Sequence, residues 1–187
     1  GNPIPFKWGK CKLATSAYGH GITTTPLQLA KGYAIIANGG YKIEPTLIKK
    51  ELNIKKGEQI ISEENSSKIN KILRKIVTSE QGTANLANII GYEIAGKTGT
   101  AQKSIKGKYS KKKVNTFASI FPVSDPKYVL IVLLDEPKLS KTYVYEYNID
   151  GKKTKIVGTP FNTAGWTSVE VAKNIIEKIG PILAIKY

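Results

Sequence analysis

The chain has 187 residues, of which 41% are hydrophobic and 23% charged, so it can fold around a sizeable core and is not disordered. Its formal net charge is +15, and Arg74 is its only arginine. Because bidentate recognition of bases and phosphates favours arginine, this charge argues against specific nucleic-acid binding. It indicates lysine-rich solvated faces or attraction to an anionic membrane surface.

Cys11 is the only cysteine and His20 the only histidine, so an internal disulfide and a Cys/His zinc site are excluded. We expect no metal and no other cofactor, and a structural role for His20 between its two glycines. The sequence has no methionine, which suggests a piece of a longer protein. The longest aliphatic run, 129–134, is too short for a membrane helix of about 20 residues, so we expect any anchor to lie upstream.

Two helices are expected in the first half of the chain. Thr25, Pro26 and Gln28 predict a helix start with a capping box, and Asn38-Gly39-Gly40 predicts its end. The second helix is expected from Ser62 to Gly82. The apolar residues expected to face the core are Leu27, Ala30, Tyr33, Ala34 and Ala37 in the first helix, and Ile69, Ile72, Leu73, Ile76 and Val77 in the second.

Three strands are expected next, over residues 92–102, 114–121 and 128–134, with a lysine-rich loop at 103–113. The turn at 122–127 is too short for a parallel crossover, so the last two strands should be antiparallel. Because residues 128–134 are apolar on both faces, they predict a central strand covered on both sides.

A hairpin and a helix are expected at the C-terminal end. Residues 143–157 predict a solvent-exposed hairpin that turns at Asp150-Gly151. Thr167 and Glu170 predict a capping box for a helix that stops at Gly180-Pro181 and buries Val169, Ala172, Ile176 and Ile179. The fold class predicted is α+β, an antiparallel sheet faced by helices. We expect one partial domain over residues 1–187, with residues 138–160 as a surface hairpin insertion.

Residues 94–102, Ile-Ala-Gly-Lys-Thr-Gly-Thr-Ala-Gln, suit two incompatible chemistries. Gly91-x4-Gly96-Lys97-Thr98 matches a phosphate-binding P-loop, and Asp135 after an apolar strand could hold Mg²⁺. Local physics argues against this NTPase hypothesis. Residues 92–95 are too bulky and β-prone to curl round a phosphate, and no amphipathic helix follows Thr98.

The same segment can be a strand. Alternation then places Lys97 and Gly99 on one face and Thr98 and Thr100 on the other. Glycine in a strand marks the close approach of a ligand or another backbone, and a free edge can bind an extended peptide. An ordinary edge strand with a solvated lysine accounts for the segment alone equally well.

Lys97-Thr98-Gly99 in its context resembles the penicillin-binding protein family, in which Lys-Thr-Gly is a signature. The segments that carry the resemblance include 19–30, Ala37-Asn38-Gly39-Gly40, Gly82-Thr83-Ala84, 92–102 and 117–137. Together, residues 16–137, and more loosely 160–185, resemble the C-terminal half of a class B, division-type (FtsI-like) transpeptidase.

The resemblance implies D,D-transpeptidation, in which a serine attacks the penultimate D-Ala carbonyl of a peptidoglycan stem peptide and a neighbouring amine resolves the acyl-enzyme. It assigns Lys97 to substrate carboxylate binding and to proton transfer near the serine. Thr98 and Thr100 would bind the carboxylate or fix the strand, and Gln102 would also contact substrate. The backbone N–H of Thr100 would be an oxyanion donor, and Gly99 would leave room for the substrate.

The chain departs from this family at its nucleophile. No Ser-x-Asn motif occurs, and Ser-x-x-Lys occurs only at Ser110 and Ser124, both downstream of Lys97. We therefore expect the nucleophile not to be in this chain, and this chain alone to be inactive.

The resemblance also implies partners and a location for the parent protein. The partners are stem peptides that end in D-Ala-D-Ala, β-lactams, membrane proteins of the division machinery and a glycan polymerase, and no specific nucleic acid. The location is the bacterial inner membrane, with this domain in the periplasm. Two alternatives stay open, a catalytically inert scaffold module and the P-loop NTPase.

Overall fold

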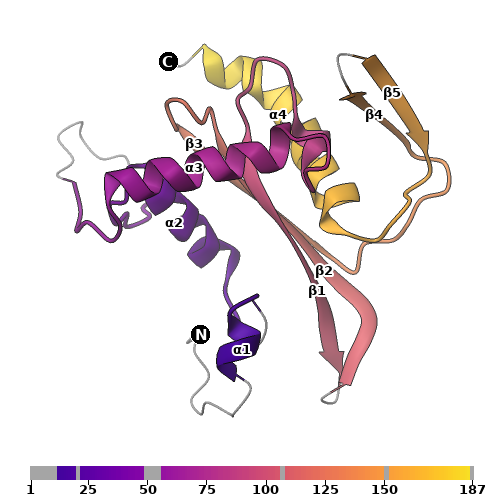
Figure 1. Ribbon diagram of the computed structural model, residues 1–187, viewed down its shortest axis with the longest axis horizontal. Helices are drawn as coiled ribbons and strands as arrows, with labels where there is room; N and C mark the ends of the chain where they lie inside the picture. Colours follow the sequence, from indigo (N-terminus) through magenta and orange to yellow (C-terminus); the bar gives the residue numbers. More distant parts are fainter. Residues whose placement is uncertain (1–11, 20–21, 49–55, 106–107, 150–151, 186–187) are drawn as a thin grey trace.

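The computed structural model describes residues 12–19, 22–48, 56–105, 108–149 and 152–185. A three-stranded antiparallel sheet in the order β1-β2-β3 lies between helices, and a separate two-stranded sheet, β4-β5, lies beside it (Figure 1). The strands are β1 (Ala95–Ile105), β2 (Lys108–Phe121), β3 (Tyr128–Asp135), β4 (Val144–Ile149) and β5 (Lys152–Val157). The helices are α1 (Lys12–Ser16), α2 (Pro26–Ala37), α3 (Glu63–Thr78) and α4 (Ser168–Ala184), with short 3-10 helices η1 (Asn85–Ala87) and η2 (Ala164–Trp166). This architecture confirms the predicted α+β class.

Helix α2 begins at the predicted capping box. The Gln28 backbone N–H donates to Thr25 Oγ1 at 3.1 Å, and the Thr25 N–H donates to Gln28 Oε1 at 2.8 Å. The expectation that its apolar residues face the core is wrong for Leu27, which is 59% exposed. It is confirmed for Tyr33 and Ala37, which are half-buried and pack against Leu73, Ala95 and Ile120. Helix α2 packs mainly on β2, β3 and α3, and none of its residues is fully buried.

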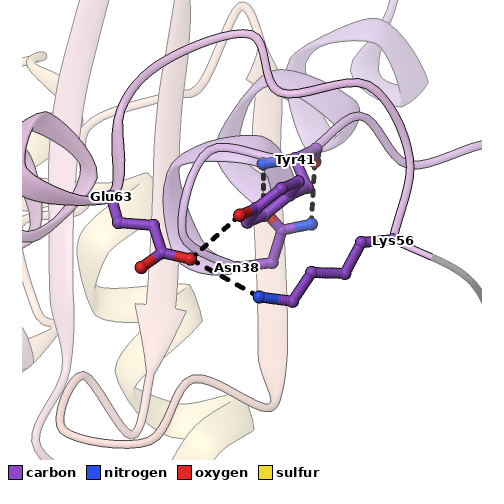
Figure 2. Close-up of polar contacts among 4 residues, drawn as sticks. All are labelled: Asn38, Tyr41, Lys56 and Glu63. Atoms are coloured by element: carbon purple, nitrogen blue, oxygen red, sulfur yellow. Dashed lines mark hydrogen bonds and ion pairs between the residues drawn. The ribbon is translucent and has the colours of Figure 1, made fainter.

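The turn after α2 is fixed by polar contacts that reach α3 (Figure 2). The Asn38 side chain donates to the Tyr41 carbonyl at 2.8 Å and accepts from the Tyr41 N–H at 2.9 Å. The Tyr41 hydroxyl donates to Glu63 Oε1 at 3.0 Å, and Lys56 Nζ lies 3.4 Å from the same oxygen. The hydrogen bond from Tyr41, followed by the interaction with Lys56, lowers the pKa of Glu63.

Helix α3 is capped by Ser62, whose Oγ accepts from the Asn65 N–H at 3.2 Å. Leu73 and Val77 are buried as predicted, but Ile72 is 60% exposed and faces away from the core. The helix ends at Thr78, earlier than predicted. Gly82 lies beyond the end of the helix and packs closely against its last turn. A Cβ at this position would lie 2.1 Å from the Ile76 carbonyl oxygen, so a side chain would clash there.

The two faces of the main sheet pack against different helices (Figure 1). Phe117 and Phe121 of β2 belong to the cluster that contains Val169 and Ile176 of α4. Ile120, on the opposite face of β2, packs with residues of α2 and α3. The period-two alternation of the strands produces this division.

Two strand predictions need correction. β3 lies at the end of the described sheet rather than at its centre, although α2 and α4 pack on it. The predicted lysine-rich loop is mostly strand, because β1 runs to Ile105 and β2 starts at Lys108. An extended hairpin directs its lysines into solvent, so their charge is compatible with strand structure.

Strands β4 and β5 form an antiparallel pair, with Val144 opposite Val157. The predicted turn at Asp150-Gly151 lies outside the described residues. The expectation of a solvent-exposed hairpin is wrong for Tyr145, which is only 3% exposed. The Tyr145 hydroxyl donates to the Trp166 carbonyl at 2.6 Å, and the two rings meet edge to face with centroids 5.1 Å apart. The hairpin is thereby attached to η2.

Helix α4 also differs from its prediction at both ends. No side-chain hydrogen bond caps it, because Thr167 Oγ1 donates to the Thr163 carbonyl and Glu170 accepts from the Tyr143 hydroxyl. The helix continues through Pro181 to Ala184, and Ile179 is 36% exposed. Gly180 is buried against the Tyr92 ring, so packing favours the helix here over the stop that Gly-Pro predicts.

In the part of the chain that the structure describes, no helix is long and apolar enough to cross a membrane.

Candidate functional site

The Lys-Thr-Gly sequence lies inside β1, which is an edge strand of the described sheet. Lys97 pairs with Ala118, and Thr100 pairs with Asn115. Because an antiparallel strand follows β1, the turn-and-helix geometry of a P-loop does not form at Gly96. The structure therefore contradicts the NTPase hypothesis.

Lys97 is exposed, and its Nζ donates to the Thr98 carbonyl at 2.8 Å. Its side chain leaves the strand on the same face as Ala95, which packs against Leu73 and Ile120. This is the face of the sheet that α2 and α3 cover. The alternation places Gly99 on that face as well.

The two glycines of this segment are in different surroundings. A Cβ at Gly96 would lie 2.6 Å from the Ala118 carbonyl oxygen and 2.7 Å from the Phe117 ring. A Cβ at Gly99 would meet only Thr116, at 4.0 Å. Gly96 is therefore required by packing within this chain, whereas the space beside Gly99 is open among the described residues.

Thr98 and Thr100 point to the other face and bond to distant segments. The Thr98 hydroxyl lies 2.9 Å from the Thr83 hydroxyl, and Thr100 Oγ1 accepts from the Ala164 backbone N–H at 2.9 Å. Sequence reasoning noted Gly82-Thr83-Ala84 only as part of the resemblance, and it gave Ala164 no role. The glycine at position 165 was the one local indication of this contact. A Cβ there would lie 2.6 Å from the Thr83 carbonyl oxygen, so only glycine allows the two segments to approach this closely.

A cavity of about 470 Å³ opens beside Thr98 and Thr100. Its walls come from β1, η1, η2 and the β4–β5 hairpin. The lining residues are Glu80, Gly82, Thr83, Asn85, Leu86, Thr98, Thr100, Tyr147, Thr163, Gly165 and Trp166. Neither Lys97 nor Gln102 lines the cavity. Gln102 is exposed farther along β1, where it pairs with Lys113 of β2. The structure thus joins Thr98 to Thr100 in one site and leaves Lys97 on the other face.

A buried polar group supports this site from β2. Asn115 is 0% exposed, and its Nδ2 donates to Thr167 Oγ1 at 2.8 Å and to Asn162 Oδ1 at 3.0 Å. Asn162 in turn donates to the Pro137 carbonyl at 2.8 Å. The loop before α4 is therefore fixed on the strand that pairs with Thr100.

The two acidic residues at the end of β3 are engaged in ion pairs with lysines. Lys103 pairs with Asp135 at 2.5 Å and with Glu136 at 2.8 Å, and these two acids raise its pKa. The acid that the P-loop hypothesis assigned to Mg²⁺ is thus paired with a lysine. Among the residues the structure describes, no group of three acidic, histidine or cysteine side chains could hold a metal ion.

Neither Ser-x-x-Lys serine lies on a helix. Ser110 is in β2, and Ser124 is in the turn before β3. Ser124 donates to Glu93 through its hydroxyl and, at 3.1 Å, through its backbone N–H. These two hydrogen bonds are the main cause of the lowered pKa of Glu93. His20 and Cys11 lie outside the described residues.

Comparisons with known proteins are consistent with the fold and with the Lys-Thr-Gly sequence on β1. The family model described as the penicillin binding protein transpeptidase domain matches residues 1–158. The chain is 32% identical over 191 residues to a curated protein named "Probable peptidoglycan D,D-transpeptidase FtsI" from Caulobacter vibrioides, covering 97% of this chain and 30% of that protein. It is 36% identical over 143 residues to stage V sporulation protein D of Bacillus subtilis, covering 70% of this chain and 22% of that protein.

Solved structures give the same result. The apo transpeptidase domain of Burkholderia pseudomallei penicillin-binding protein 3 matches 94% of this chain with a TM-score of 0.74 and 26% identity, over 47% of that domain. The chain thus spans less than half of these relatives and corresponds to the C-terminal part of the curated ones. It belongs to the transpeptidase-domain family of class B penicillin-binding proteins.

Proposed function

We propose that this chain is the part of a serine D,D-transpeptidase that holds the donor stem peptide along β1. The observation that carries the proposal is the Lys97–Thr100 segment on an edge strand, with open space beside Gly99. An extended peptide can add to such an edge through main-chain hydrogen bonds. Membership of the family makes a peptidoglycan stem peptide, or a β-lactam that imitates its end, the appropriate ligand.

The proposed reaction begins with a serine from a segment outside this chain. Its oxygen attacks the penultimate D-Ala carbonyl, the C–N bond breaks, and the terminal D-Ala leaves with the proton. Lys97 binds the negatively charged carboxylate of the substrate. It also stabilises the negative charge that develops near the attacking serine. The backbone N–H of Thr100 donates to the oxyanion. Gln102, farther along the exposed strand, contacts the donor peptide.

The Thr98 and Thr100 hydroxyls have a double role in this proposal. Each already has a partner within the chain, Thr83 for Thr98 and the Ala164 N–H for Thr100. A hydroxyl can donate and accept at once, so Thr100, which accepts here, retains its proton for a substrate carboxylate.

The biological setting is also a proposal. The Caulobacter relative is named FtsI and the Bacillus relative is named for sporulation, so identity alone does not assign a septal role. We place the parent in septal cell-wall synthesis, anchored in the inner membrane with this domain in the periplasm. Division-machinery membrane proteins and a glycan polymerase are its proposed partners. Residues 138–160 are proposed to be an insertion within the domain.

The test is fluorescent-penicillin labelling of the full-length parent, comparing the natural protein with Lys97→Ala. We expect labelling to fall by about 100-fold or more, the usual effect of removing a charge-stabilising group. Lys111→Ala is the matched control, because Lys111 is an exposed lysine of the neighbouring strand and should label normally. An intact, folded parent that does not label would favour the inert scaffold module. A covalent adduct on the isolated 187 residues would show that the nucleophile is in this chain.

A further inference from the structure

A groove of about 690 Å³ lies between the C-terminal end of α2, helix α3 and the turn before β3. It shares no lining residue with the cavity beside Thr98 and Thr100. We propose that this groove is an interaction surface that binds an acidic peptide segment of a partner protein. The inference concerns the groove itself and does not depend on the proposed transpeptidase function.

Three cations line the groove, and all of them come from α3. Lys71, Arg74 and Lys75 are three or four residues apart, so they follow one another along one side of the helix. Lys71 and Lys75 are exposed, and neither makes an ion pair or a side-chain hydrogen bond with any residue that the structure describes. Their ammonium groups are therefore available to anions from outside the chain.

Arg74 is half-buried and anchored at one corner of its guanidinium. Its Nη1 donates to the Ile94 carbonyl at 2.6 Å. Since a guanidinium carries five N–H donors, others are left for a carboxylate in the groove. A side chain that is already held in this way loses less conformational freedom when it binds an anion.

The acidic residues near these cations are already engaged. Glu63 is the one acid that lines the groove among the described residues, and it accepts from the Tyr41 hydroxyl and pairs with Lys56 (Figure 2). Glu93 attracts Arg74 electrostatically, but its carboxylate is bound by the hydroxyl and the backbone N–H of Ser124. The groove therefore has an excess of positive charge, which the carboxylates of a partner would complement.

The remaining wall of the groove is partly apolar and is fixed in place. Val123 and Pro126 supply apolar surface from the turn before β3. Ser66 and Asn70 of α3 both donate to the Ile36 carbonyl, at 2.6 Å and 3.1 Å, and so fix α3 to the end of α2. Because these contacts form the groove before a ligand enters, little has to be ordered on binding.

The size and spacing of the groove fit a peptide. A volume of about 690 Å³ is far larger than a single carboxylate or phosphate and lies within the range of ligand pockets. Lys71 and Lys75 are one helical turn apart, about 6 Å between their Cβ atoms. Alternate side chains of an extended peptide are about 6.6 Å apart. A segment with acidic residues at alternate positions and apolar residues between them therefore matches both the lysines and the apolar wall.

The experiment measures binding of a fluorescein-labelled peptide, Gly-Glu-Leu-Glu-Leu-Glu-Gly, to the full-length parent by fluorescence anisotropy at physiological salt. The matched peptide has glutamine in place of each glutamate. We expect the acidic peptide to bind at least about 10-fold more tightly than its neutral counterpart. Lys71→Ala and Lys75→Ala together should weaken binding of the acidic peptide by roughly 10-fold.

The control removes the same charge elsewhere. Lys68→Ala with Lys111→Ala changes two exposed lysines that do not line the groove, and this variant should bind the acidic peptide normally. Circular dichroism melts check that both double variants are folded. Equal loss of affinity in the control would indicate general attraction to a chain of net charge +15 and would overturn the inference.

Two further outcomes would also overturn it. The first is a natural parent that does not bind the acidic peptide or binds both peptides equally. The second concerns a lipid surface and is tested with vesicles that contain phosphatidylglycerol. If the Lys71 and Lys75 double variant alone loses vesicle binding, and the peptide does not bind, the groove belongs to a membrane contact instead.

Discussion

The Thr83 hydroxyl lies 2.9 Å from the Thr98 hydroxyl, which joins the turn before η1 to the strand that carries Lys-Thr-Gly. The same turn is covered by Gly165, whose missing side chain allows η2 to approach the Thr83 carbonyl. Thr83 is therefore the point where three separate segments of the chain meet beside the candidate site.

This contact should appear as an energetic coupling. We expect Thr83→Val and Thr98→Val each to lower the free energy of unfolding of the chain by about 1 kcal/mol, because each leaves a hydroxyl without its partner. The double variant should lose less than the sum, with a coupling of about 0.5–1.5 kcal/mol in urea unfolding. Thr142→Val, at an exposed position, is the control. Strict additivity of the two losses would show that the hydroxyls do not interact.

The buried amide of Asn115 should be needed to hold the loop before α4. Asn115→Leu removes the donor to both Thr167 and Asn162 at a site with no solvent access. We expect a loss of about 1–3 kcal/mol. We also expect faster hydrogen exchange at the Ala164 N–H, which donates to Thr100. Unchanged exchange at Ala164 would mean that this loop is held independently of Asn115.

Local pattern predicted the strand of the site, and long-range contacts completed it. The alternation of side chains in residues 94–102 was enough to place Lys97 and Thr98 on opposite faces of the strand. Nothing in the sequence pairs Thr98 with Thr83, or Thr100 with Ala164, because a contact between a hydroxyl and a distant backbone group leaves no periodic signature. The cavity beside them is made by four elements and could not be read from any one of them.

The mispredicted elements show where tertiary packing overrides local signals. Gly180-Pro181 resembles a helix stop, yet Gly180 packs on Tyr92 and the helix continues. Thr167 and Glu170 have the spacing of a capping box, but each bonds to another segment instead. Polar residues with the right spacing serve a cap only when no stronger partner is near.

The polar turn after α2 should respond to pH through Glu63. Its pKa is lowered in the folded chain, first by the hydrogen bond from Tyr41 and then by Lys56 (Figure 2). A lowered folded-state pKa stabilises the fold above the unfolded-state pKa, and this contribution is lost as the pH falls through the folded-state pKa. Tyr41→Phe should therefore raise the pKa of Glu63 in an NMR titration. Lys56→Met should raise it as well, and a pKa of Glu63 that neither substitution changes would show that these two contacts do not act on this carboxylate.

Substitution by alanine should change the unfolding free energy at only one of the two strand glycines. Gly96→Ala places a methyl group 2.6 Å from the Ala118 carbonyl oxygen, so β1 and β2 must separate, at a cost of about 1–3 kcal/mol. Gly99→Ala meets only Thr116, at 4.0 Å, and should leave the unfolding free energy of the chain nearly unchanged. In the full-length parent, however, Gly99→Ala should reduce penicillin labelling, because its methyl group enters the space proposed for the serine and the donor peptide. Normal labelling of a stable Gly99→Ala parent would show that the donor does not bind on this face of β1.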